Sequence, residues 1–234
     1  MKSFLMLGQS NMAGRGELGT VPPIENPHCF MLRNGRWQPM GEPVNPDRNW
    51  SIHEGVSLAA SFADEFAKAY HEDVGLIPCA DGGTSIREWQ PGELLYDHAV
   101  FEAKLAMRTS SFAGILWHQG ENDSYTEKDA ALYHDRFLTL FSSLFRDLSL
   151  PERTPVLIGE LGAFVAEHDG GRCRYFTRVN DALYRLSGEL PCAAFVSAEG
   201  LTCKPDHAHF DAPACRTFGV RYFREYQKLV GRYF

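Results

Sequence analysis

Near its amino end the chain reads Phe4-Leu5-Met6-Leu7-Gly8-Gln9-Ser10-Asn11-Met12-Ala13-Gly14, an apolar run that stops at a glycine and gives way to a small polar group. A short continuous apolar run is typical of a buried strand, and glycine allows a sharp turn beside it. Open α/β sheets place their chemistry where strands end, so we expect Ser10 at the tip of a turn. A strand followed by an ordinary polar loop is the simpler interpretation, and this stretch alone does not exclude it.

The overall composition excludes several classes of partner. Of the 234 residues, 44% are hydrophobic and 23% are charged, which is ordinary for a globular protein. The formal net charge is −7, which argues against nucleic acid as a partner, because nucleic acid requires a basic face. No apolar run approaches the roughly 20 residues that span a bilayer, so we expect no membrane partner either.

The start of the chain and its cysteines indicate the cellular compartment of the protein. The apolar start is only a few residues long and runs directly into Ser10, so it does not read as an export signal. None of the six cysteines forms a C-x-x-C pair, which indicates neither a zinc ribbon nor a thioredoxin-type site. A chain of this size without an export signal is expected to keep its cysteines reduced. We therefore expect a cytoplasmic protein.

Short apolar runs alternate with amphipathic segments along the rest of the chain. Residues 15–54 are irregular and rich in proline, apart from a hairpin expected around Asn34-Gly35. Four further strands are predicted at 74–79, 112–118, 155–159 and 193–197, and helices at 55–71, 96–108, 126–148, 174–187 and 212–226. This alternation predicts a parallel sheet covered on both faces. We therefore expect residues 1–234 to form a single α/β domain with three α/β/α layers, doubly wound around about five parallel strands.

Polar or glycine-rich turns follow the predicted strands. They occupy residues 8–11, 81–85 and 119–123 and the loop after the fifth strand. In a parallel sheet these strand ends lie along one edge, so residues far apart in sequence can meet there.

The last of these loops contains Asp206 and His209, three residues apart. In a helical turn this spacing places two side chains on one face. A carboxylate that accepts from one ring nitrogen fixes the histidine tautomer and leaves the other nitrogen free as a base. A serine hydroxyl needs such a base to act as a nucleophile, which makes Ser10 the natural partner. Taken alone, His209 reads as a solvated loop histidine and Asp206 as a turn residue.

Four blocks of sequence, taken together, resemble a known family. The chain is similar to the SGNH-type hydrolases, whose domain is flavodoxin-like, and specifically to the carbohydrate acetylesterase branch that includes sialate O-acetylesterases and family 6 acetylxylan esterases. The blocks are Gly8-Gln9-Ser10-Asn11-Met12-Ala13-Gly14, Gly82-Gly83-Thr84-Ser85-Ile86 with Trp89, Trp117-His118-Gln119-Gly120-Glu121, and Asp206-x-x-His209-Phe210.

The resemblance implies a role for each matching residue. Ser10 is implied as the nucleophile, His209 as the general base and acid, and Asp206 as the carboxylate that orients His209. The implied oxyanion donors are the backbone N–H groups of Ser10 and Gly83 and the side-chain amide of Gln119, where the wider clan carries an asparagine. The implied reaction removes an O-acetyl group from a carbohydrate through an acyl-Ser10 intermediate, without a cofactor or a metal.

Five further residues are candidates for support or for substrate contact. Gln9 and Asn11 flank the serine. Glu121 either orients His209 in place of Asp206 or holds the first turn through Asn11 or Arg15, and we expect the second role. Arg87 and Trp89 either line the sugar side of the cleft or are an ordinary surface arginine and core tryptophan.

Two other functions compete with the esterase hypothesis. His207-x-His209-x-Asp211 imitates the start of a zinc hydrolase site, in which imidazoles and a carboxylate converge on the metal. No histidine follows His209 to complete such a site. A sugar-binding module that has lost catalysis is the other candidate. The expected substrate is a small-molecule or oligosaccharide acetyl ester selected by residues 15–54, and the pattern leaves the oligomeric state open.

Overall fold

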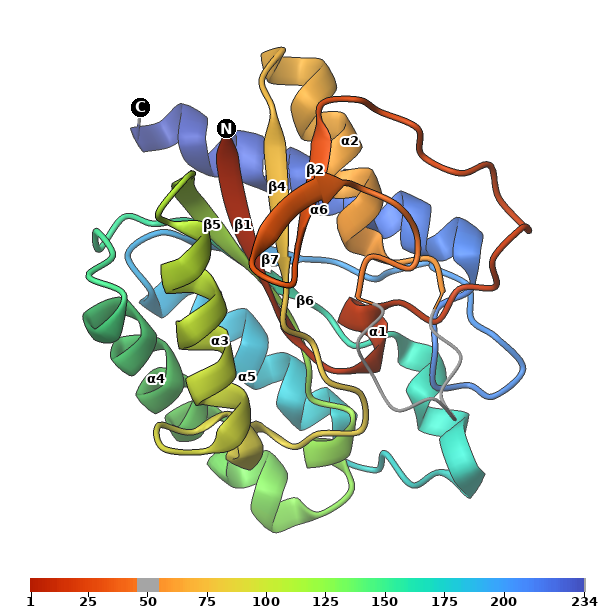
Figure 1. The fold of residues 1–234 in the computed structure, drawn as a ribbon. Helices are drawn as coiled ribbons and strands as arrows, with labels where there is room; N and C mark the ends of the chain where they lie inside the picture. Colours follow the sequence, from red (N-terminus) through yellow and green to blue (C-terminus); the bar gives the residue numbers. More distant parts are fainter. Residues whose placement is uncertain (46–54, 234) are drawn as a thin grey trace.

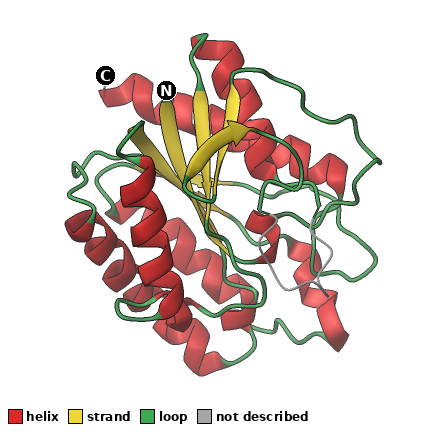
Figure 2. Ribbon diagram, viewed as in Figure 1, coloured by secondary structure: helices red, strands yellow, loops and turns green. Residues whose placement is uncertain are grey.

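The computed structural model describes residues 1–45 and 55–233, and a seven-stranded sheet forms its middle layer (Figures 1 and 2). The strand order is β3-β2-β4-β1-β5-β6-β7. All neighbouring pairs are parallel except β2 and β3. The strands are β1 (Lys2–Gly8), β2 (Cys29–Arg33), β3 (Arg36–Pro39), β4 (Val74–Pro78), β5 (Ser111–His118), β6 (Val156–Gly159) and β7 (Ala193–Val196).

Helices cover both faces of this sheet (Figure 1). One face carries α2 (Leu58–Tyr70) and α6 (Ala212–Tyr233), and the other carries α3 (Leu94–Ala106), α4 (Glu127–Asp147) and α5 (Phe176–Glu189). Successive residues of β1 alternate between the two cores: Phe4 and Met6 pack with α2 and α6, whereas Leu5 and Leu7 pack on the other side. Because both faces are covered, the strand is apolar at every position. The predicted three-layer α/β/α fold is confirmed.

The sheet has seven strands rather than about five because the predicted hairpin joins it. Residues 34 and 35 form the turn with positive φ at both positions, as a two-residue hairpin turn requires. The hairpin's first strand pairs in parallel with β4, and its second strand becomes the edge. A Cβ on Gly75 of β4 would lie 2.5 Å from the Trp37 ring, so the glycine makes room for the hairpin's tryptophan. Residues 46–54 of the predicted irregular segment lie outside the described residues.

The predicted helices are all present, with ends shifted by a few residues, and several short ones were not predicted. The helix α1 (Ser10–Ala13) follows β1 directly, and short 3-10 helices occupy Ile86–Trp89 (η1), Asn122–Ser124 (η2) and Ala163–Gly170 (η3). Helix α6 continues seven residues beyond its predicted end at 226. No helix in the part of the chain that the structure describes is long and apolar enough to cross a bilayer.

Candidate active site

Ser10 is the first residue of α1, immediately after the central strand. Gly8 has φ +134°, and a Cβ there would lie 2.0 Å from the carbonyl oxygen of His118, so β1 and β5 approach closely only because the residue is glycine. The Gln9 N–H then donates to that carbonyl at 3.0 Å. No described residue accepts from the backbone N–H of Ser10, and the residue is 6% exposed.

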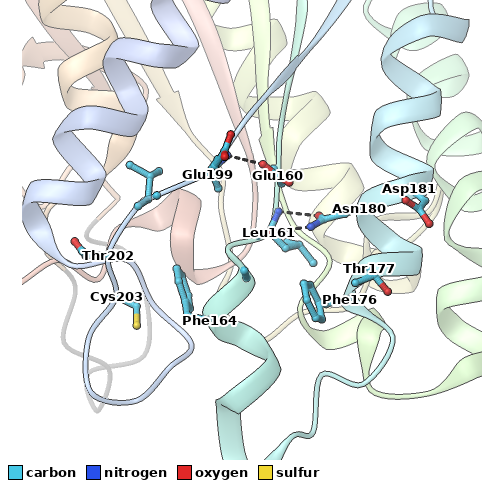
Figure 3. A pocket seen from close by; sticks show the side chains of 14 residues that line it. Glu160, Leu161, Phe164, Phe176, Thr177, Asn180, Asp181, Glu199, Thr202 and Cys203 are labelled. Atoms are coloured by element: carbon cyan, nitrogen blue, oxygen red, sulfur yellow. Dashed lines mark hydrogen bonds between the residues drawn. The ribbon is translucent and has the colours of Figure 1, made fainter.

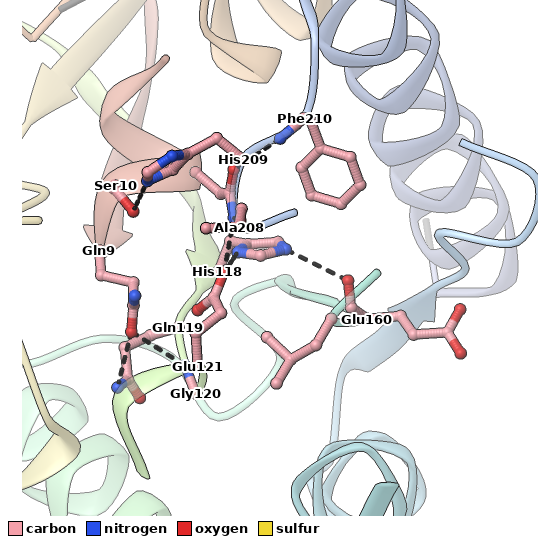
Figure 4. A network of polar contacts seen from close by, with 12 residues as sticks. Gln9, Ser10, His118, Gln119, Gly120, Glu121, Glu160, Ala208, His209 and Phe210 are labelled. Atoms are coloured by element: carbon pink, nitrogen blue, oxygen red, sulfur yellow. Dashed lines mark hydrogen bonds and ion pairs between the residues drawn. The ribbon is translucent and has the colours of Figure 1, made fainter. Parts of the chain in front are cut away.

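His209 connects Ser10 to Asp206. Its Nε2 lies 3.0 Å from Ser10 Oγ (Figure 4), and its Nδ1 lies 2.8 Å from Asp206 Oδ2. Because a carboxylate only accepts, the Nδ1–H donates to Asp206 and Nε2 accepts from the serine hydroxyl. Two residues 199 positions apart are therefore in hydrogen-bond contact.

Asp206 also shapes the loop that carries His209. Its Oδ1 accepts from the backbone N–H groups of Ala208 (2.9 Å) and His209 (3.0 Å). Partial burial opposes the charged form, but the hydrogen bonds from His209 and from these N–H groups outweigh it, and the pKa of Asp206 lies below its usual range. The carboxylate therefore stays charged at neutral pH.

Asn11 attaches α1 to the loop on both sides of His209. Its Nδ2 donates to the carbonyl oxygen of Ala208 at 3.0 Å, and its Oδ1 accepts from the N–H of Phe210 at 3.1 Å. The same Nδ2 donates to Glu121 Oε1 at 2.6 Å. The residue after Ser10 thus fixes the two peptides that flank His209.

Glu121 contacts Asn11 and not His209, which is the second of its two predicted roles. Its Oε1 also lies 3.7 Å from Nδ1 of the fully buried His118, whose Nε2 donates to the carbonyl oxygen of Glu160 at 3.2 Å (Figure 4). Burial lowers the pKa of His118 in spite of the nearby Glu121 carboxylate, so the imidazole is neutral at neutral pH.

The glycine turn after β4 presents a second free backbone donor. Gly83 has φ +75° and nothing near its Cβ position, and no described residue accepts from its N–H. Asn122 Nδ2 donates to the Gly83 carbonyl oxygen at 2.8 Å, which fixes the turn from the end of β5. Sequence reasoning did not single out Asn122, although it belongs to the polar turn 119–123 that marked this strand end.

Gln119 is completely buried behind this turn. Its Nε2 lies within hydrogen-bond distance of three acceptors: Asp123 Oδ2 (2.6 Å), the Thr84 carbonyl oxygen (2.9 Å) and Gln9 Oε1 (3.2 Å). Burial raises the pKa of Asp123 to about 6, against the hydrogen bonds from Gln119 and Ile86. Asp123 is a further residue of the site that the sequence analysis did not single out.

Both Trp89 and Arg87 belong to η1, the 3-10 helix that follows the glycine turn. Trp89 is fully buried and donates from Nε1 to Thr84 Oγ1 at 3.1 Å, so it supports the glycine turn and does not line a cleft. Arg87 is exposed.

The three residues of the zinc hypothesis point to different partners. His209 is held by Ser10 and Asp206, whereas His207 Nδ1 faces Glu167 at 3.5 Å. Asp211 accepts from the N–H of Ala214 at 2.8 Å and so caps α6. Among residues 1–45 and 55–233, no group of three His, Cys, Asp or Glu side chains is arranged to hold a metal ion.

A pocket of about 700 Å³ lies beyond β6, between η3, α5 and residues 198–203, which lead into the loop that carries Asp206 and His209 (Figure 3). Phe164, Phe176 and Leu161 provide apolar walls, and Asp181 and Glu199 provide carboxylates. Its lining includes neither Ser10 nor His209 nor Gly83, so it is separate from the site above.

The comparison with protein families identifies the chain. Residues 1–228 match the model of the family "Carbohydrate esterase, sialic acid-specific acetylesterase". The chain belongs to this family. The protein is an esterase that acts on carbohydrates, as the resemblance of its four sequence blocks predicted.

Individual relatives agree with this assignment. The "Probable carbohydrate esterase At4g34215" of Arabidopsis thaliana is 31% identical over 95% of this chain and 89% of its own length. The crystal structure of that plant protein has a TM-score of 0.87, covering 97% of this chain and 98% of the plant chain.

More distant structures share the fold. NanS has a TM-score of 0.76 at 17% identity and covers 98% of this chain and 97% of its own. XAC1771 of Xanthomonas citri, described as a carbohydrate acetylesterase, has a TM-score of 0.71 at 17% identity and covers 98% of this chain and 56% of its own. A lipase/acylhydrolase from Enterococcus faecalis and a GDSL-like lipase from Parabacteroides merdae share the fold, with TM-scores of 0.57 and 0.58 at 12% and 14% identity.

Proposed function

We propose that this carbohydrate esterase removes O-acetyl groups through a covalent acetyl-Ser10 intermediate. The observation that carries the proposal is the position of His209, 3.0 Å from the serine hydroxyl and 2.8 Å from Asp206. The preference for acetyl rests on the family description, which names an acetylesterase. A cytoplasmic location, and the absence of nucleic-acid and membrane partners, stay predictions.

Acylation begins when Ser10 Oγ bonds to the ester carbonyl carbon. The hydroxyl proton passes to His209 Nε2, and the carbonyl π pair moves onto the carbonyl oxygen, which becomes negative. The charged imidazole faces Asp206, whose lowered pKa keeps it anionic. When the tetrahedral intermediate collapses, the bond to the sugar oxygen breaks, and that oxygen takes the proton from Nε2.

Deacylation repeats these steps with water. His209 Nε2 removes a proton from the water as its oxygen bonds to the acetyl carbon, and the proton then returns to Ser10 Oγ as acetate leaves. The negative oxygen of both intermediates requires donors placed in advance. The N–H groups of Ser10 and Gly83 have no described acceptor, and we propose them as two of these donors.

The test is hydrolysis of p-nitrophenyl acetate by Ser10→Ala. We expect kcat to fall by roughly 10⁴-fold or more, because residual catalysis without a nucleophile is small, while thermal unfolding is unchanged. Ser61→Ala is the matched control, since Ser61 is a buried serine of α2 bonded only to backbone. Retained turnover by Ser10→Ala would refute the proposal.

Covalent labelling separates the esterase from a sugar-binding module. A fluorophosphonate is expected to add one adduct to the wild type, detected by intact mass, and none to Ser10→Ala. A panel of acetylated xylo-oligosaccharides, sialic acids and simple monosaccharides would then identify the carbohydrate. An unlabelled wild type would favour the binding module.

A further inference from the structure

The side-chain NH₂ group of Gln9 has no hydrogen-bond acceptor among residues 1–45 and 55–233. Gln9 immediately precedes the nucleophile and is 4% exposed. Its Oε1 has three neighbouring N–H donors, but none of the described residues accepts a hydrogen bond from its Nε2. A side-chain amide N–H beside Ser10 that has no acceptor among the described residues is available to a ligand or a reacting group.

The orientation of this amide is fixed by its neighbours. Oε1 lies 3.2 Å from Gln119 Nε2, 3.4 Å from the N–H of Gly120 and 3.5 Å from the N–H of Asn122. Rotating the amide by 180° would direct its NH₂ group at three other donors. The oxygen therefore points into the turn after β5, and the nitrogen is the end left for another acceptor. Figure 4 shows the Gln9 side chain below Ser10, with its oxygen at the start of the dashed lines.

Gln119, by contrast, has no N–H to spare in this arrangement. An amide nitrogen carries two hydrogens, and Gln119 Nε2 already faces Asp123 Oδ2 at 2.6 Å and the Thr84 carbonyl oxygen at 2.9 Å. Donating to a substrate would require breaking a hydrogen bond to a buried acceptor. Its position suits a residue that holds the glycine turn and the Gln9 amide in place.

We infer that Gln9, rather than Gln119, supplies the third oxyanion donor, from Nε2 to the carbonyl oxygen of the acetyl ester. The inference rests on the proposed acyl-serine reaction. Gln9 Nε2, the Ser10 N–H and the Gly83 N–H each lack an acceptor among the described residues. The first two belong to consecutive residues, so they move together with the attacking hydroxyl. Gln119 is then a positioning residue.

Gln9→Glu tests this role with little change in shape. The carboxylate keeps the oxygen that faces the N–H groups of Gly120 and Asn122, and it replaces only the NH₂ donor. We expect kcat for p-nitrophenyl acetate to fall on the order of 100-fold or more, as for other lost oxyanion donors, with KM nearly unchanged. Because a carboxylate at a 4% exposed position costs stability, kcat is measured well below the unfolding temperature of the variant. Gln9→Met provides the same loss of donor without a new charge.

Gln119→Met is the comparison variant. It is expected to lower the unfolding temperature and to reduce kcat less than Gln9→Met does. The inference is overturned if both Gln9 variants keep kcat within about threefold of the wild type, well short of the loss of an oxyanion donor. It is also overturned if Gln119→Met loses more kcat at an unchanged unfolding temperature. Ser10→Ala run in parallel separates this outcome from failure of the esterase mechanism, since that failure would leave Ser10→Ala active.

A second measurement uses the wild type alone. Diethyl p-nitrophenyl phosphate forms a phosphoryl ester on a reactive serine, with p-nitrophenolate as the leaving group, and its phosphoryl oxygen occupies the oxyanion position. In a crystal structure of this adduct we expect that oxygen to accept from Gln9 Nε2 and from the N–H groups of Ser10 and Gly83. An oxygen bonded to Gln119 Nε2 or Asn122 Nδ2 instead of Gln9 would contradict the inference.

Discussion

Among individual residues, two carboxylates lie near the base but differ in what they contact. Asp206 accepts from His209 and from two backbone N–H groups. Glu121 is 5% exposed, and among the described residues its carboxylate reaches only Asn11 and His118. Of the two carboxylates, Asp206 is therefore the one that fixes the tautomer of His209 whose Nε2 faces Ser10.

Substitution of Asp206 is expected to lower kcat more than substitution of Glu121. Asp206→Asn replaces the acceptor facing Nδ1 and permits the wrong tautomer, so kcat should fall by roughly 10³-fold or more. Glu121→Gln keeps a side chain that can bond Asn11, and kcat should fall by less than about tenfold, because the base keeps its orienting carboxylate. Steady-state kinetics with p-nitrophenyl acetate make the comparison. The reverse ranking would make Glu121 the orienting carboxylate.

Asp123 should give the stability of the protein a distinct pH dependence. Burial raises its pKa from 3.8 to about 6 in the folded state, so between these values the folded protein binds more protons than the unfolded chain. The free energy of unfolding therefore falls as pH rises through this window, by about 3 kcal/mol in total from this group, and changes no further above it.

Asp123→Asn removes this titration. The free energy of unfolding of the variant, relative to that of the wild type, should rise by up to about 3 kcal/mol between about pH 4 and pH 7. Urea unfolding at a series of pH values measures the difference, and other titrating groups largely cancel. A difference that is independent of pH would show that Asp123 ionises normally.

At the scale of elements, Asn11 couples helix α1 to the loop that carries His209. Removing its side chain leaves the Phe210 N–H, the Ala208 carbonyl oxygen and the Glu121 carboxylate without this partner. We expect Asn11→Ala to lower the free energy of unfolding by ~3 kcal/mol. We also expect kcat to fall on the order of 100-fold, because small displacements of a catalytic group are costly.

Asn180→Ala is the control for this coupling. Asn180 bonds both backbone groups of Leu161, at 2.9 Å and 3.0 Å, after a different strand of the same sheet. Its loss should cost ~2 kcal/mol of stability with kcat nearly unchanged. Equal losses of kcat in the two variants would show that Asn11 acts only through stability.

The sequence predicted elements better than it predicted side-chain directions. Apolar runs and helical periodicity located five strands and five helices, because those patterns follow from burial. The hairpin was predicted, but not its pairing with β4, since parallel pairing depends on the chain that follows. Ser10, Asp206 and His209 could be named from spacing and resemblance. The orientations of three side-chain amides, those of Gln9, Gln119 and Asn122, depend on contacts between the ends of three strands. The spacing of residues in the sequence does not predict such contacts.

For the molecule as a whole, the packing of α6 against α2 brings the two ends of the chain together. Helix α6 follows the loop that carries Asp206 and His209, and α2 packs beside β1, which leads into Ser10. The two helices meet at Gly219, where a Cβ would lie 2.0 Å from the Leu58 carbonyl oxygen and 2.3 Å from Ser61 Oγ. Backbone at that distance cannot yield as a flexible side chain can, so the helices must separate to admit a methyl group.

Gly219→Ala is therefore expected to destabilise the whole fold, although alanine favours helix. We expect a loss of ~3 kcal/mol, the upper part of the range for overpacking a core. Gly231→Ala, in the same helix with open space at its Cβ position, should change stability by no more than about 1 kcal/mol, in the stabilising direction. Urea unfolding of both variants provides the measurement. Because α6 holds the loop that positions His209, Gly219→Ala should also have a lower kcat under conditions in which it is still folded. Unchanged stability and kcat would mean that the two helices do not pack this closely.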